Sequence, residues 1–203
     1  MGAPKALVEF EGRPLVEHLL APPLVREFGD VVVVLGHHAE AVRPVVARLG
    51  YRHVVNPDPD RGRTGSVHVG LRALRAAIRA VFVQPADCPI ILPQTYLSLA
   101  AAIGPADVAV PVHRGKRGHP PLLSVKIVPR ILAAGPDEPL RRLLQARDVD
   151  CRLVEVDEPG VLVNIDRPED LRQLTGLCAL DRGEETRIPG RGPSGSSGPL
   201  TAR

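Results

Sequence analysis

The sequence predicts an α/β fold with a mostly parallel sheet. Short apolar runs rich in Val alternate along the chain with segments whose Leu, Val and Ile residues recur at helical spacing. Turns that contain glycine or proline separate most of these segments. In one stretch, Val81 to Pro89, an apolar strand runs into a proline-bounded turn that carries Asp87. Ligands of open α/β sheets bind at the carboxyl ends of strands, so Asp87 either handles a cation or phosphate there or bonds its own turn backbone.

The composition fits one domain with an aliphatic core. The chain has 203 residues, of which 44% are hydrophobic and 2% aromatic, which argues against nucleic-acid modules that stack bases on aromatic rings. The net charge of +3 suits an anionic small substrate and is weak support for DNA or RNA. Cys88, Cys151 and Cys178 lack CxxC spacing, so we expect reduced thiols in a cytoplasmic protein. We find no signal peptide and no run near the ~20 apolar residues of a membrane span.

The first third of the chain predicts three strands with helices between them. The strands are expected at 6–10, 31–35 and 51–55. The run at 31–35 consists of β-branched valines followed by a leucine, which is typical of a strand covered on both faces. Pro14 favours the first turn of a helix, and Gly50 ends a second helix at 39–49.

Two local patterns in this part invite a ligand role. His37 and His38 are adjacent, but neighbours point to different sides and no third ligand is nearby, so a loop is favoured over a metal site. The segment 61–66 precedes a helix with apolar residues from Val67 onward. Its Thr64 or Ser66 is expected to cap that helix, and its backbone N–H groups could also bind an anion. It lacks the Gly-Lys-Ser/Thr of a Walker A loop.

The remainder of the chain continues the alternation. Strands are expected at 80–84, 107–112, 122–125, 151–156 and 161–165, and helices at 93–103, 128–134 and 139–147. The basic segment 113–121 is expected to be a mobile loop, either a solvated face or a lid over an anionic substrate. Asp166 with Glu169 fits a capping box that opens a last helix.

The chain loses this periodicity at about residue 177. Residues 183–203 are rich in Gly, Pro, Ser and Arg, a composition that cannot bury enough apolar surface to fold. We therefore expect a folded domain at 1–176 and a disordered tail at 177–203.

Seven short motifs, taken together, resemble the molybdenum cofactor nucleotidyltransferases of the MobA/MocA-like type. In the family's order they are Met-Gly-Ala-Pro-Lys-Ala-Leu at 1–7, Gly-Arg-Pro-Leu at 12–15, Val-Leu-Gly-His at 34–37, Arg-Thr-Gly-Ser-Val at 63–67, Gln-Pro-Ala-Asp-Cys-Pro at 84–89, Gly-His-Pro at 118–120 and Asn-Ile-Asp-Arg-Pro-Glu-Asp-Leu at 164–171. The Gly-His-Pro motif and the short loop before Val67 are more similar to the cytidylyltransferase branch than to the guanylyltransferase branch.

The resemblance implies a fold and a reaction for residues 1–176. The implied fold is the Rossmann-like, three-layer nucleotide-diphospho-sugar transferase (GT-A type) fold. The implied reaction moves a nucleoside monophosphate, expected to be CMP from CTP, onto the phosphate of molybdopterin and releases pyrophosphate. Mg²⁺ is the implied cofactor, and the implied partners are the nucleoside triphosphate, molybdopterin and a molybdoenzyme.

The resemblance also implies roles for individual residues. Asp87 matches the metal carboxylate at the catalytic centre, and Asn164 matches the second metal-side position. Lys5 matches the lysine that holds triphosphate oxygens and acts in catalysis. The positions matching the nucleotide side are Gly65, Ser66, Pro85 and Ala86, and those matching the acceptor side are Gly118, His119 and Pro120.

One departure from the family pattern leaves two explanations open. The family opens with a strand that ends in a Leu-Ala-Ala-Gly-x-Ser-x-Arg loop directly before Met-Gly-x-Pro-Lys, whereas this sequence starts at that methionine. We expect a start assigned at an internal methionine of a longer natural chain; a crippled nucleotide-binding remnant is the alternative. Rival functions are a catalytically silent relative that aids molybdoenzyme maturation and a nucleotidyltransferase that acts on a sugar phosphate.

Overall fold

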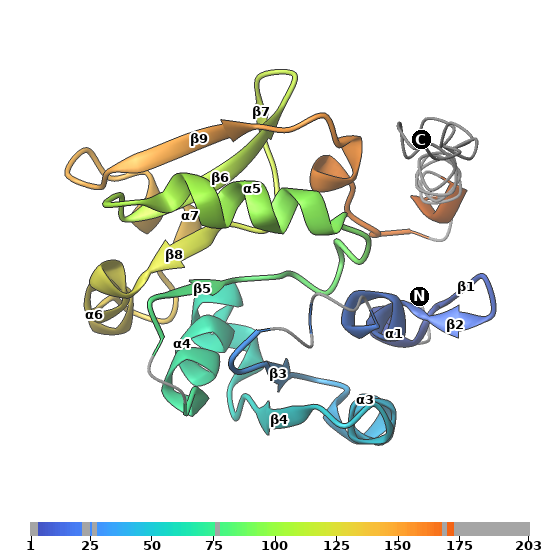
Figure 1. Ribbon diagram of the computed structural model, residues 1–203. Helices are drawn as coiled ribbons and strands as arrows, with labels where there is room; N and C mark the ends of the chain where they lie inside the picture. Colours follow the sequence, from blue (N-terminus) through green and yellow to red (C-terminus); the bar gives the residue numbers. More distant parts are fainter. Residues whose placement is uncertain (1–3, 22–24, 26–27, 76–77, 168–169, 173–203) are drawn as a thin grey trace, which may run out of the picture.

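A computed structural model describes residues 4–21, 25, 28–75, 78–167 and 170–172 (Figure 1). The predicted tail at 177–203 lies outside these residues, as does Glu169 of the predicted capping box. Strands and helices alternate through the described part, which confirms the predicted α/β class. Among the described helices, none has the length and apolar character needed to cross a membrane.

The strands form two sheets and a short hairpin. The hairpin joins β1 (Glu9–Phe10) to β2 (Arg13–Pro14), and the smaller sheet pairs β3 (Val32–Leu35) in parallel with β4 (Arg52–Val55). The larger sheet has the order β5-β8-β6-β7, with β9 also paired to β6. Its strands are β5 (Ala80–Phe82), β6 (Val108–His113), β7 (Lys116–Arg117), β8 (Leu122–Ser124) and β9 (Cys151–Glu155). The β6–β9 pairing is parallel, and the other pairings in this sheet are antiparallel.

The helices follow the strands closely in sequence, as expected for an α/β chain. The α-helices are α1 (Leu15–Leu20), α3 (Ala39–Arg48), α4 (Arg63–Ala73), α5 (Pro93–Ile103), α6 (Val128–Ala133) and α7 (Leu140–Leu144). Short 3₁₀ helices are η1 (Lys5–Leu7), η2 (Pro59–Arg61), η3 (Val125–Ile127) and η4 (Pro159–Leu162). The predicted bounds of α5 are confirmed, and its Pro93 occupies the first helical position, where a missing N–H costs nothing.

The larger sheet is built around β6, all six residues of which are buried. Val108 and Val110 pack with Ile131 of α6, while the intervening Ala109 packs with Leu99 of α5. Successive side chains of a strand point to opposite faces, so this alternation places β6 between two helical layers. The layered core holds the turn after β5 in a fixed position.

The two sheets face each other across a cavity. Within the described part of the chain β3 pairs only with β4, and β5 only with β8. A cavity of about 1840 Å³ is lined by the valines of β3 and by β5. The prediction that both faces of β3 are covered is met only at Leu35, because Val32, Val33 and Val34 are half-buried beside this cavity.

Three local predictions were wrong. Residues 5–7 form η1 in place of the first half of a strand at 6–10, and residues 159–162 form η4 in place of a strand at 161–165. The basic segment 113–121, predicted to be a mobile loop, contains the β6–β7 hairpin instead. Short apolar runs do not separate strand from 3₁₀ turn by themselves, which explains the first two differences.

The close approach of the 118–121 segment to η4 leads to the first prediction. Gly118 donates its N–H to the Pro111 carbonyl at 2.8 Å, and a Cβ added at Gly118 would lie 2.5 Å from the carbonyl oxygen of Val161. Gly118→Ala should therefore lower the free energy of unfolding by about 1–3 kcal/mol, because backbone must shift. Urea denaturation measures this change. Gly135→Ala, where an added Cβ meets nothing within 4 Å, is the matched control and should stay within about 0.5 kcal/mol.

Candidate functional site

Asp87 lies just beyond the carboxyl end of β5, and its side chain is only 15% exposed. The turn itself is closed by the Cys88 N–H, which donates to the Pro85 carbonyl at 3.3 Å. The carboxylate does not close the turn: its Oδ2 accepts from Arg63 Nη2 at 3.1 Å, and its Oδ1 is buried without a hydrogen-bond partner. A buried carboxylate oxygen that lacks a donor is costly, so this oxygen marks a position where a ligand would be stabilising.

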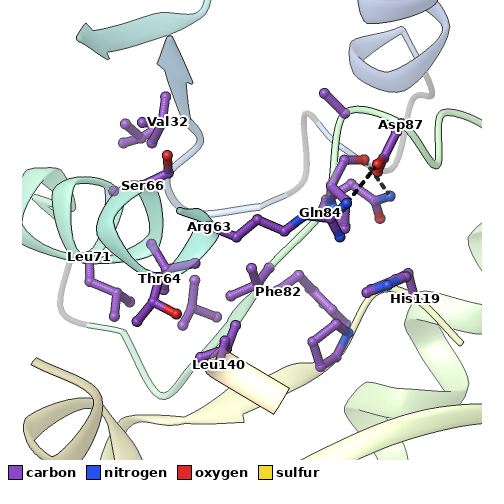
Figure 2. A pocket seen from close by; sticks show the side chains of 18 of the residues that line it. Val32, Arg63, Thr64, Ser66, Leu71, Phe82, Gln84, Asp87, His119 and Leu140 are labelled. Atoms are coloured by element: carbon purple, nitrogen blue, oxygen red, sulfur yellow. Dashed lines mark hydrogen bonds and ion pairs between the residues drawn. The ribbon is translucent and has the colours of Figure 1, made fainter. Parts of the chain in front are cut away.

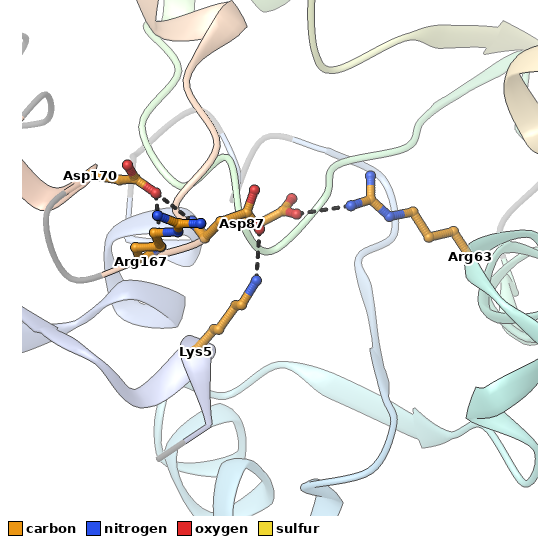
Figure 3. A network of polar contacts seen from close by, with 6 residues as sticks. Lys5, Arg63, Asp87, Arg167 and Asp170 are labelled. Carbon is orange, nitrogen blue, oxygen red and sulfur yellow. Dashed lines mark hydrogen bonds and ion pairs between the residues drawn. The ribbon is translucent and has the colours of Figure 1, made fainter. Parts of the chain in front are cut away.

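A second turn, after η4, is tied to the Asp87 turn through the backbone. The Ile165 N–H donates to the Asp87 carbonyl at 2.7 Å. Next to Ile165, the Asp166 carboxylate accepts a hydrogen bond from Lys5 Nζ at 2.7 Å. This bond holds the pKa of Asp166 below its usual range, with a smaller contribution from the charge of Arg63. Figure 3 shows Lys5 and Arg63 approaching the Asp87 turn from two different elements.

His119 adds an imidazole to the same region. Its Nδ1 is buried and lacks a hydrogen-bond partner. Burial lowers the pKa of His119 from its ordinary value, the neighbouring Asp87 charge opposes this, and the Arg63 charge adds to it. The burial that lowers the pKa favours the neutral imidazole. Figure 2 shows His119 on one side of the cavity and Arg63 and Ser66 on the other.

The cavity between the sheets gathers most of the residues predicted from the sequence. Those that line it are Lys5, Ser66, Pro85, Ala86, Asp87, Gly118 and His119. Gly36, Gly62, Arg63 and Lys116 line the same cavity. The carboxylates in the lining are Asp30, Asp87, Asp137 and Glu138. The Asp87 carboxylate, together with the basic side chains of Lys5, Arg63 and Lys116, can hold a polyanion and a cation.

Three predicted site residues do not line this cavity. Gly65 is buried in the first turn of α4, where an added Cβ would lie 3.5 Å from Pro136 Cβ. Pro120 is fully buried. Asn164 is exposed, and its chain neighbour Ile165 carries the backbone bond to Asp87. Burial in the core accounts for the position of Pro120, whereas the space around Gly65 would admit a Cβ at ordinary contact distance.

The start of α4 differs from the prediction. The helix begins at Arg63, and its N-cap is Gly62, whose φ of 88° is in the left-handed region that favours glycine. No side chain caps the helix. Thr64 instead donates its hydroxyl proton to the Glu138 carbonyl, and Ser66 Oγ accepts from Asn56 Nδ2 at 3.1 Å. The predicted capping by Thr64 or Ser66 was therefore wrong, and the first N–H groups of α4 are left without a side-chain acceptor.

The capping-box prediction at Asp166 also needs correction. Asp170 Oδ2 accepts from the N–H groups of Asp166 and Arg167, at 2.9 and 2.8 Å. The side chain of Asp166 is thereby available to Lys5. Sequence reasoning thus missed two site residues, Asp166 and Arg63. Arg63 had one usable signal, its place at a helix start behind a glycine in a loop that the sequence already assigned to the nucleotide side.

The available oxygen ligands fit a hard divalent cation. Asp87 offers a buried carboxylate oxygen, and Asn164 offers an exposed amide oxygen. Magnesium is held in proteins by one or two such oxygens and completes its shell with water and substrate phosphates. Among the described residues no group of three or more His, Cys, Asp or Glu could hold a metal.

His37 and His38 lie in a turn, as predicted, and His37 Nε2 is 3.3 Å from Asp60 Oδ1.

Cys88 follows Asp87 directly but is not a candidate nucleophile. Burial, together with the smaller effects of the Asp87 and Glu158 charges, raises the pKa of Cys88 to about 12. Its Sγ donates to the Gly160 carbonyl at 3.6 Å. A thiol in this state is neutral and inert at physiological pH.

The sequence matches a family model described as the MobA-like NTP transferase domain over residues 1–156. Bifunctional protein GlmU of Paracoccus denitrificans is 35% identical to the chain over 162 residues, which cover 78% of this chain and 34% of the relative. Nicotine blue oxidoreductase of Paenarthrobacter nicotinovorans is 26% identical over 179 residues, covering 84% of this chain and 87% of the relative. The chain thus spans about a third of the length of the GlmU relative.

Solved structures share the fold. Rv0371c of Mycobacterium tuberculosis H37Rv superposes with a TM-score of 0.74 at 22% identity, covering 87% of this chain and 90% of that chain. Its complex with manganese gives a TM-score of 0.71 at 24% identity, covering 84% and 90%. Molybdopterin-guanine dinucleotide biosynthesis protein A of Archaeoglobus fulgidus gives 0.59 at 19% identity, covering 88% and 92%.

The fold predicted from the resemblance is thereby confirmed as a Rossmann-like nucleotidyltransferase fold. The family model covers most of the described residues and includes Lys5, Arg63, Asp87 and His119. From this match, the chain belongs to the family of MobA-like NTP transferase domains.

Proposed function

We propose that this chain transfers CMP from CTP to the terminal phosphate of molybdopterin and releases pyrophosphate. Family membership supplies the reaction class, nucleotidyl transfer. The observation that carries the proposal is the Asp87 carboxylate, with one buried oxygen free of donors and two cationic side chains, Lys5 and Arg63, in the same cavity. A triphosphate and a phosphate acceptor are both anions, and a site of this kind offsets their mutual repulsion.

The proposed reaction needs no covalent enzyme intermediate. An oxygen of the acceptor phosphate forms a bond to the α-phosphorus of CTP, and the bond from that phosphorus to the bridging oxygen of the β-phosphate breaks. The electron pair leaves with pyrophosphate. The work of the protein is to align the two anions and to offset the charge that accumulates on the α-phosphate oxygens and the leaving group.

Asp87 and Asn164 are the residues that would hold Mg²⁺. When bound, this hard cation would offset negative charge on phosphate oxygens. A solved relative of the same fold was crystallised with manganese, an ion with similar oxygen ligands. The bond from the Ile165 N–H to the Asp87 carbonyl holds the turn that carries Asp87 against the residue that follows Asn164 in the chain.

The remaining cavity residues divide between the two substrates. All of them line the one cavity. We assign Lys5 to the triphosphate oxygens, Ser66, Pro85 and Ala86 to the nucleoside, and Gly118 and His119 to the acceptor. The preference for CTP and for molybdopterin rests on the Gly-His-Pro motif and the short loop before Val67, and the product would pass to a molybdoenzyme.

A substrate panel tests the proposal, because the relatives carry different names, including that of an oxidoreductase. Pyrophosphate release should be followed with CTP, GTP, ATP and UTP against molybdopterin and against sugar 1-phosphates. Release that requires CTP and molybdopterin supports the proposal. Release only with a sugar 1-phosphate would replace the acceptor, and binding of molybdopterin without any turnover would identify a silent relative.

Asp87→Asn should lower kcat by roughly 10²-fold or more, because the amide removes the negative charge that attracts the cation. The fold should be retained, since the substitution is isosteric and the Arg63 partner is 73% exposed. Turnover and the melting temperature are measured on the same samples. Asp60→Asn, at an 86% exposed carboxylate, is the control and should keep wild-type turnover.

Lys5→Ala should raise the KM for CTP more than it lowers kcat, because a lysine that holds triphosphate oxygens acts mainly in binding. Asp166→Asn distinguishes a role in binding from a purely structural ion pair. It removes the charge that pairs with Lys5 and leaves the lysine in place. Steady-state kinetics on both variants decide the question. If both variants raise KM equally, Lys5 serves only to hold Asp166.

A further inference from the structure

Arg63 connects α4 to the turn after β5. It is the first residue of α4, and its side chain reaches Asp87, where Nη2 donates to Oδ2 at 3.1 Å (Figures 2 and 3). The two partners differ in exposure, because the Arg63 side chain is 73% exposed and that of Asp87 is 15% exposed. One carboxylate oxygen is thus covered by an arginine that is otherwise surrounded by solvent.

This ion pair adds little to folding. Pairs with an exposed partner are screened by water and restrict a long side chain, so their contribution to stability is small. A guanidinium carries several further N–H donors in a planar fork. The bond to Asp87 uses a donor at Nη2, which leaves others available to the cavity that Arg63 lines.

Arg63 lies among the other polar groups of the proposed site. It lines the same cavity as Lys5 and His119. The same guanidinium bonds the carboxylate proposed to hold the metal. Moving this one exposed side chain would therefore change the electrostatics of all three groups at once.

We propose that Arg63 exchanges between two anions, the Asp87 carboxylate in the nucleotide-free protein and the triphosphate in the nucleotide complex. This inference rests on the nucleotidyl transfer proposed above. A divalent cation and a guanidinium compete for the same carboxylate charge, so the ion pair opposes metal binding while the cavity holds no nucleotide. Phosphate oxygens match the guanidinium fork, so an arriving triphosphate draws Arg63 away and frees Asp87 for the cation.

If Arg63 exchanges in this way, Arg63→Ala should change the affinity for the metal and the affinity for CTP in opposite directions. The metal alone should bind more tightly, by roughly threefold to tenfold, because its competitor is gone. CTP should bind more weakly, by roughly tenfold, because one phosphate ligand is gone. An arginine that only supports the shape of the site would weaken both, and one outside the site would change neither.

The experiment uses two titrations of the full chain. Free Mn²⁺ is followed by electron paramagnetic resonance as the protein is added without nucleotide, and CTP binding with Mg²⁺ present is followed by calorimetry. The variants are Arg63→Ala, Arg63→Lys and, as a matched control, Arg72→Ala. Arg72 is an exposed arginine in the last turn of the same helix and is not among the residues that line the cavity, so its removal should leave both affinities within about twofold.

Opposed shifts in Arg63→Ala, with Arg63→Lys between it and the wild type, support the exchange. Shifts in the same direction, no shift in either titration, equal shifts in Arg72→Ala, or a wild-type protein that binds neither probe would each overturn it. Circular dichroism confirms that the variants are folded. Failure of the proposed function looks different: opposed shifts would persist while no acceptor gives pyrophosphate release.

Discussion

The hydrogen bond from the Ile165 N–H to the Asp87 carbonyl is the contact on which the site depends. It joins two turns that are far apart in the sequence and brings the segment after η4 against the end of β5. The residue after Ile165 is Asp166, which pairs with Lys5, and Figure 3 shows Lys5 reaching toward the Asp87 turn. A backbone bond is insensitive to which side chains flank it, so the geometry of the site survives changes in the residues that it positions.

Much of the fold could be predicted from the sequence because its signals are local. The valine run of β3, the Pro93 start of α5 and the turn that holds Asp87 are each encoded within a few residues. The division of the strands into two sheets is not encoded in any short segment, because it depends on which strands pair in the folded protein. The half-buried valines of β3 follow from that division and not from their own sequence.

The same distinction explains the site. Asp87 and Lys5 stand in motifs that can be recognised within short segments, and the cavity does collect them. The link between Lys5 and Asp166, and that between Arg63 and Asp87, join elements that only tertiary structure brings together. Pro120 shows the converse, because this motif residue is fully buried and does not line the cavity.

The facing edges of β3 and β5 also bear on how this polypeptide behaves at high concentration. An unpaired edge presents a row of backbone donors and acceptors that another extended chain can extend, and the neighbouring valines add apolar surface. Molecules with such edges are prone to aggregation through intermolecular β-pairing. The protein should therefore be purified at low concentration and in the presence of a nucleotide that fills the cavity.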